Sequence, residues 1–284
     1  MKKKTAISEW IILIGNSIKG RVFQIVIVIG ICGLLKHHYS TASPDQLRWI
    51  LCPTAFATEM ITGENFTFVR NEGYVSSDRF LVIAKSCAGV NFMILAIILI
   101  ALAHVISAGK ERNGIYKMIG AVMAGYAVTI IVNTMRIAGA IHLYSLPIYG
   151  GVVTPAAVHR LEGILVYFVA LRVLYGVSLR IGKKIGKSPP GSSVIHSIIP
   201  LIAYLSLMIL VPLLRGALKE NPERFCFHSL FVAGCPVLFI LIVWGIKGFR
   251  LLFRSTRMCR HRLHNRNSIT IPVRMIHLMN SIFK

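Results

Sequence analysis

Long apolar runs separated by short polar stretches recur along most of this chain. A segment at 158–179 is interrupted by Arg160, Glu162 and Arg172. The more uniform apolar segments contain no acidic residue and lie at roughly 22–35, 88–108, 117–144, 194–214 and 229–246. A helix over the 21 residues 88–108 is about 31 Å long, which matches the hydrocarbon core of a bilayer. The pattern therefore predicts an all-α integral membrane helical bundle of about six transmembrane helices.

The long polar segment between the first two apolar runs has a pattern of its own. Residues 47–61 can form an amphipathic helix at the membrane surface. Two short runs of strand-forming residues, 66–69 and 74–76, flank a polar turn. We therefore expect a small extracytoplasmic hairpin shortly before the second span.

Composition and charge place the chain in a membrane rather than on a nucleic acid. Hydrophobic residues make up 55% of the 284 residues and charged residues 15%, with a mean hydropathy of +0.68, whereas soluble domains carry about 25% charged residues. The net charge of +22 is concentrated in Lys2–Lys4, in loops around 110–117 and 180–187, and after Lys247, where no acidic residue follows. Such placement predicts anionic lipid as the partner of the basic loops and tail, and no nucleic acid.

The same charges predict the orientation of the chain. Segment 37–86 holds half of the ten acidic residues, so we expect it outside the cell and both termini in the cytoplasm. The first apolar run has no small-residue cleavage site, which favours a retained helix. The expected organisation is a polytopic domain over 1–246 and a basic cytoplasmic tail over 247–284, in the cytoplasmic (inner) membrane.

The six cysteines show no CxxC pair and no metal-ligand spacing. We therefore expect no metal, no organic cofactor and no disulfide framework.

Three reactive side chains are predicted to lie at one depth in the outer leaflet. Cys87 precedes the second span, Arg136 lies about two turns before the end of the third, and His159 opens the fourth. A thiolate is a nucleophile that a helix N-terminus stabilises, a histidine can move its proton, and a buried guanidinium can stabilise an oxyanion.

Further residues around these three are candidates for orientation or substrate binding. Asn133 shares a helix face with Arg136 and is expected to orient it or to bind a substrate carbonyl. Gly89 is small enough for a substrate backbone to approach, and Glu162 follows His159 at i+3 and is placed to orient it. Each reactive residue also has a structural alternative: Cys87 as a small buried side chain, His159 as an interfacial residue, and Arg136 as a partner of Glu162 or a carbonyl.

The residues around these three side chains resemble the motifs of the exosortase/archaeosortase family. The matching stretches are Ser86–Asn91, Asn133–Ile137 and His159–Gly163. They correspond to a cysteine with a following glycine before a span, an N-x-x-R-I segment within a span, and a histidine four residues before a glycine. The resemblance covers about residues 60–180, and this chain has Ala88 where many members have serine after the cysteine.

This resemblance implies a membrane-embedded cysteine protease and transpeptidase. Such enzymes cleave a C-terminal sorting signal, made of a short motif, a hydrophobic helix and a basic cluster, from secreted proteins and transfer the new C-terminus through a thioester. By motif position Cys87 would be the nucleophile, His159 the acid/base and Arg136 the oxyanion stabiliser.

A non-enzymatic membrane protein is the alternative interpretation. In a transporter or an assembly scaffold, Arg136 would bind an anion or close a helix contact. Transporters often show repeats or paired broken helices, and neither is visible in this sequence.

Overall fold

The computed structural model describes residues 2–77, 81–107, 114–147, 149–150, 153–185, 193–223, 225–243 and 245. The chain divides into two units, Met1–Pro236 and Val237–Lys284. The predicted basic tail over 247–284 lies outside the described residues.

The described part is mostly helical, and five of its helical segments are long and apolar enough to cross a membrane. These segments are Gly20–Thr41, Lys85–Ile106, Ile115–Tyr144, Ala157–Gly182 and Phe225–Val243. The first four belong to the helices α1 (Lys2–Thr41), α3 (Val90–Ser107), α4 (Gly114–Tyr144) and α5 (Pro155–Ile185). The structure therefore confirms a mostly helical protein with several helices able to cross a membrane, as predicted.

The predicted fifth span, 194–214, is a shorter apolar helix with an irregular middle. It consists of α6 (Ser193–Leu205), the π-helix η3 (Ser206–Leu210) and α7 (Val211–Leu214), and its apolar part Ile198–Leu214 has fewer than 18 residues. A short helix α8 (Ala217–Glu220) follows. Pro200 lies inside α6 and Pro212 near the start of α7; a proline lacks the backbone N–H that a regular helix needs.

The first span is longer than the sequence predicts. The expected run 22–35 continues as helix to Thr41, giving a candidate span of 22 residues. Polar contacts stabilise the last turns of α1: Lys36 Nζ donates to Asn91 Oδ1 at 2.7 Å. Lys85 Nζ also donates to the carbonyls of Ser40 at 3.1 Å and Ala42 at 2.7 Å, where the end of α1 would otherwise leave acceptors unpaired. The first span is therefore completed by residues that flank the apolar run, Tyr39 among them.

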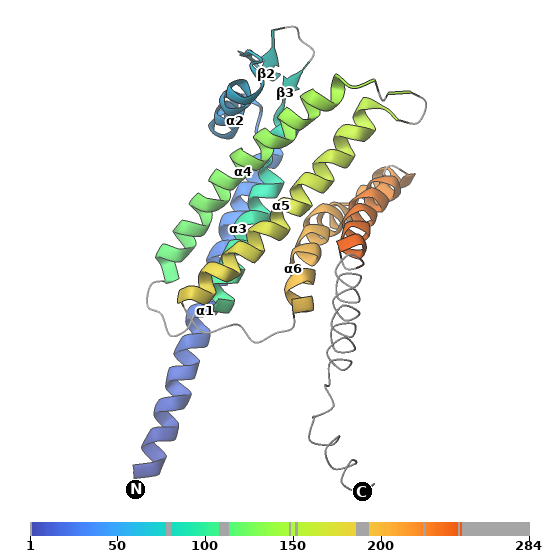
Figure 1. The fold of residues 1–284 in the computed structure, drawn as a ribbon. Helices are drawn as coiled ribbons and strands as arrows, with labels where there is room; N and C mark the ends of the chain where they lie inside the picture. The colour runs from blue at the N-terminus through green and yellow to red at the C-terminus, as the bar shows by residue number, and fades with distance from the viewer. Residues whose placement is uncertain are drawn as a thin grey trace, which may run out of the picture. The chain divides into compact units, whose positions relative to one another are not determined.

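Helix α3 forms the centre of the bundle. Its sequence is apolar on every side, as expected of a buried helix, and it packs against α1, α4, α5 and α6. Gly125 of α4 permits a close approach, since a Cβ there would lie 2.5 Å from Ile97 Cγ1 of α3. Figure 1 shows α4 and α5 side by side, with α1 and α3 against them and α2 with the strands at one end.

A small sheet leads the chain into α3. The predicted hairpin is confirmed as β1 (Phe66–Val69) and β2 (Gly73–Ser76), paired from Phe66↔Ser76 to Val69↔Gly73. A third strand, β3 (Val82–Ile83), pairs with β2 and was not predicted, because two residues are too short a run to recognise. Gly73 has φ +118°, and a Cβ there would overlap the carbonyl oxygen of Ile83, so only glycine fits between β2 and β3.

The predicted helix over 47–61 is confirmed as α2 (Arg48–Thr62), after a 3-10 turn η1 (Asp45–Leu47). Its polar Thr54 and Thr58 face the protein and donate to the carbonyls four residues earlier, each at 2.8 Å. Its outer face instead exposes Trp49, Phe56 and Met60. Ile50 and Leu51 are also buried, so both faces of the helix carry large apolar side chains, whereas a helix lying against water exposes a polar face.

Candidate active site

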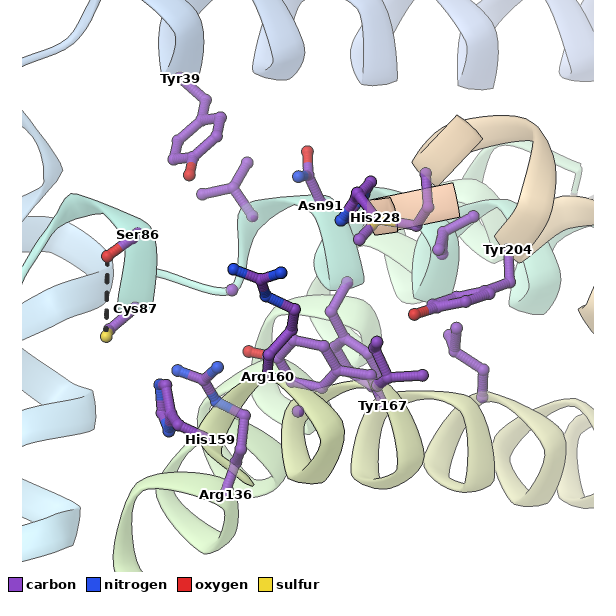
Figure 2. Close-up of a pocket in the computed structure, with 18 of the residues that line it drawn as sticks. Tyr39, Ser86, Cys87, Asn91, Arg136, His159, Arg160, Tyr167, Tyr204 and His228 are labelled. Carbon is purple, nitrogen blue, oxygen red and sulfur yellow. Dashed lines mark hydrogen bonds between the residues drawn. The ribbon is translucent and has the colours of Figure 1, made fainter. Parts of the chain in front are cut away.

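A cavity of about 680 Å³ lies between the N-terminal half of α3, the facing sides of α4 and α5, and the irregular segment α6–η3. Its size falls within the range of about 300–1,000 Å³ that small ligands occupy. No aspartate or glutamate is among the described residues that line it. Figure 2 shows most of the lining residues, which include Tyr39, Cys87, Asn91, Phe92, Leu95, Arg136, His159, Arg160, Tyr167, Leu171, Tyr204, Met208 and His228.

Cys87 lies in the connection that joins the sheet to α3. It ends the 3-10 turn η2 (Lys85–Cys87), and the N–H groups of Cys87 and Ala88 donate to the carbonyls of Ala84 and Lys85. Gly89 follows with φ +68°, and its carbonyl accepts the N–H of Met93 at 3.0 Å in the first turn of α3. Cys87 therefore precedes a helix N-terminus, whose unpaired N–H groups favour negative charge. The Sγ atom lies 3.9 Å from Ser86 Oγ, the contact drawn in Figure 2.

Gly89 packs against protein on the side where a Cβ would be. A Cβ there would lie 3.2 Å from Thr129 and 3.4 Å from both Asn133 and Tyr167. Glycine is thus needed here for its left-handed backbone and for close packing against α4 and α5.

Asn133 and Tyr167 hold the backbone of Cys87. The Asn133 amide Nδ2 donates to the carbonyl oxygen of Cys87, and the hydroxyl of Tyr167 donates to Asn133 Oδ1 at 2.7 Å. Asn133 is fully buried on α4. Its hydrogen bonds with Cys87 and Tyr167 therefore fix the Cys87 backbone, whereas the sequence suggested that Asn133 orients Arg136 or binds a substrate carbonyl.

Arg136 lies one turn further along α4 and is only 7% exposed. Its guanidinium carbon lies 5.3 Å from the centre of the Tyr167 ring, a cation–π distance. It also packs against Gly163 of α5, where a Cβ would lie 3.2 Å from Nη1. Among the residues that the structure describes, Nε and Nη2 have no hydrogen-bond partner. A buried guanidinium with unused donors beside a cavity is suited to bind a negatively charged oxygen.

His159 and Glu162 form a pair on the first turns of α5. Nδ1 of His159 lies 3.5 Å from Glu162 Oε2, an ion-pair distance rather than a short hydrogen bond. The Glu162 carboxylate packs against Gly139 of α4, where a Cβ would lie 3.0 Å from Oε1. With Nδ1 facing Glu162, Nε2 is the ring nitrogen left for another partner.

The three reactive side chains interact with one another. The Cys87 thiol interacts with the His159 ring and with the charge of Arg136, and Arg136 with the carboxylate of Glu162. Figure 2 shows the His159 ring and the Arg136 guanidinium side by side in the cavity wall. The structure thus brings together Cys87, Arg136 and His159 from three helices, with Asn133, Gly89 and Glu162 supporting them.

Cys32, Cys52 and His104 do not line this cavity. Cys32 is buried against the Ile94 carbonyl, Cys52 is exposed on α2, and His104 lies near Lys117 at the opposite end of α3. The described residues contain no group of three or more metal-ligating side chains.

Sequence reasoning missed the aromatic residues of the site. Tyr167 and Tyr204 lie within apolar segments, where an aromatic residue is usually a packing residue. One signal was present: His159, Gly163 and Tyr167 recur every four residues and so share one face of α5. No comparable signal in the sequence indicates that Tyr204 or His228 lines the cavity.

Comparison with known proteins gives no match: no family model, no curated protein and no solved structure is similar to this chain. Its function is therefore inferred from its own residues.

Proposed function

We propose that this protein is an exosortase-like cysteine protease and transpeptidase that acts within the membrane. One observation carries the proposal: Cys87, Arg136 and His159, from three different helices, line one cavity and interact there. These are the same three residues that the motif resemblance selects.

The chemistry would proceed in two acyl transfers. Cys87 Sγ attacks the scissile carbonyl while His159 Nε2 accepts the thiol proton, and the guanidinium of Arg136 stabilises the oxyanion. The tetrahedral intermediate collapses, the peptide C–N bond breaks, and His159 returns the proton to the leaving amine. A nucleophilic acceptor then attacks the thioester, gives its proton to His159 and releases Cys87.

The proposed topology has six spans, with α6–η3–α7 as the fifth. Its support is the basic residues at 110–117 and 180–187 against the acidic segment 37–86. In this arrangement both termini and the basic tail are cytoplasmic, the protein lies in the cytoplasmic membrane, anionic lipid contacts its basic loops, and the cavity opens toward the extracytoplasmic side.

The test is processing of a secreted protein that carries a motif–helix–basic C-terminal tail, in cells that express the wild-type protein or Cys87→Ala. Tail removal should be lost with Cys87→Ala, Arg136→Ala and His159→Ala, while membrane levels of the protein stay unchanged. Cys52→Ala is the matched control, because Cys52 is exposed on α2 and does not line the cavity. It should process the tail as the wild type does.

Equal processing by wild type and Cys87→Ala would remove the enzyme assignment. Arg136, with its unused buried donors, would then be the anion-binding or structural residue of a transporter or scaffold.

A further inference from the structure

The inner part of the cavity has walls of a different chemistry from the part that holds Cys87. Phe92 and Leu95 of α3, Leu171 of α5 and Met208 of η3 line it with apolar side chains. We call these four residues and Tyr204 the apolar chamber. Phe92, Leu95 and Leu171 are almost fully buried in the protein.

Tyr204 brings an unsatisfied hydroxyl to this chamber. The residue is only 1% exposed, and its hydroxyl has no hydrogen-bond partner among the described residues. Its ring packs edge-on against Phe168 at 5.9 Å, which fixes its direction. Figure 2 shows the ring reaching into the cavity, with the oxygen on the side toward Tyr167. Leaving a buried hydroxyl unpaired costs about 1–3 kcal/mol, so an unpaired hydroxyl aimed into a cavity indicates a ligand.

The unused groups are hydrogen-bond donors. Arg136 contributes Nε and Nη2, and Tyr204 contributes its O–H. An acyl chain of a lipid offers no acceptor to a donor deep in an apolar chamber. A polypeptide offers a carbonyl at every residue together with apolar side chains.

The irregular helix supports a role in binding. The π-helical turn Ser206–Leu210 places Met208 in the chamber wall, and such turns occur frequently at functional sites. Methionine is flexible and adapts to varied apolar surfaces.

We propose that the apolar chamber binds an extended apolar peptide segment, and that Tyr204 donates a hydrogen bond to one of its backbone carbonyls. This inference rests on the proposed function, because it identifies the chamber as the site for the apolar residues next to the cleavage point. Its test does not use Cys87, so the chamber and the enzyme assignment can fail separately.

The experiment is photo-crosslinking of the purified full-length protein with a capped tetra-leucine peptide that carries one diazirine leucine. Crosslinks should saturate with peptide concentration and map to Leu95, Leu171 or Met208. Tyr204→Phe should raise the half-saturating concentration about tenfold, the effect of losing one buried hydrogen bond.

Tyr126→Phe is the matched control. The Tyr126 hydroxyl donates to the Trp49 carbonyl at 2.7 Å, and Tyr126 does not line the cavity. This variant should lower the thermal unfolding midpoint and leave the half-saturating concentration unchanged. Tyr204→Phe should leave the unfolding midpoint of the ligand-free protein unchanged or raised, since it removes an unpaired hydroxyl.

Three results would overturn the inference. One is equal half-saturation for wild type and Tyr204→Phe. Another is non-saturating crosslinks only on exposed apolar residues such as Phe23 and Ile131. The third is loss of the chamber crosslinks on adding anionic phospholipid, which would make the chamber a lipid site. Saturable crosslinks in a protein that processes no tailed substrate would instead support the chamber and contradict the enzyme.

Discussion

Tyr167 connects two residues of the candidate site that have different tasks. Its hydroxyl bonds to Asn133, which holds the Cys87 carbonyl, and its ring lies under the Arg136 guanidinium. The ring also stacks on Phe92 of α3 at 4.9 Å. One side chain of α5 thus sets both the backbone of the nucleophile and the position of the cation.

At the residue scale we expect Tyr167→Phe to separate these two contributions. The variant keeps the ring under Arg136 and removes the hydrogen bond to Asn133, whose oxygen is then buried without this partner. Stability should fall by about 1–3 kcal/mol, measured as the free energy of unfolding in detergent, and alkylation of Cys87 by iodoacetamide should change in rate. Tyr167→Leu, which removes the ring as well as the hydroxyl, should impair tail processing more severely than Tyr167→Phe does.

A double-mutant cycle checks this pairing. If Tyr167 acts through Asn133, the losses in Tyr167→Phe and Asn133→Ala are not additive. Additive losses would show that the two residues act independently.

The grouping of Cys87, Arg136 and His159 around one cavity could be predicted from the sequence, but the residues that hold them could not. The three stand out because polar residues near the end of a span are few. The exact pairing of Asn133 with the Cys87 carbonyl depends on how α3 and α4 pack, and Gly89 shows its role only when Thr129, Asn133 and Tyr167 surround it.

At the scale of elements, α2 differs most from what its sequence pattern predicts. The helix itself is confirmed, but its buried face includes Thr54 and Thr58 beside Ile50 and Leu51, and its exposed face carries large apolar side chains such as Trp49, Phe56 and Met60. Trp49 stacks on Tyr126 of α4 at 5.9 Å, and Tyr126 lies well inside the candidate span Ile115–Tyr144. The sequence pattern could not predict this depth, because burial in lipid and burial in protein select the same apolar residues.

We therefore expect the outer face of α2 to lie in the lipid rather than in water. Cys52 is exposed on this face between Trp49 and Phe56. It should react slowly with a membrane-impermeant maleimide in intact cells, while Asn71→Cys in the hairpin turn should react quickly in a Cys52→Ala background. Equal rates at the two positions would place α2 in water.

At the scale of the whole molecule, the distribution of charge predicts a single orientation. Segment 37–86 carries five of the ten acidic residues, and the loop 180–187 is basic. Five candidate spans are evident in the described residues, and the remaining proposed span, the fifth in chain order, is the short helix Ile198–Leu214. The sequence could not predict whether this helix crosses the membrane, because a helix of this length with two prolines is at the lower limit for spanning a bilayer.

The orientation can be measured with the same reagent. Asn71→Cys should be labelled in intact cells, and Lys187→Cys should be labelled only after the membrane is opened. Both should be made in a chain whose native cysteines are replaced by alanine, so that each signal reports one position. Labelling of Lys187→Cys in intact cells would reverse the proposed topology.

The contact between Lys85 and the end of α1 has a consequence for biogenesis. The ammonium that binds the carbonyls of Ser40 and Ala42 belongs to a residue more than forty positions later in the chain. During synthesis the first helix therefore leaves the ribosome with its C-terminal end incomplete, and this end is completed only after the hairpin and Lys85 have been made. Assembly of this end of the bundle then depends on the order in which the segments emerge, so a chain stalled before Lys85 would lack these two contacts.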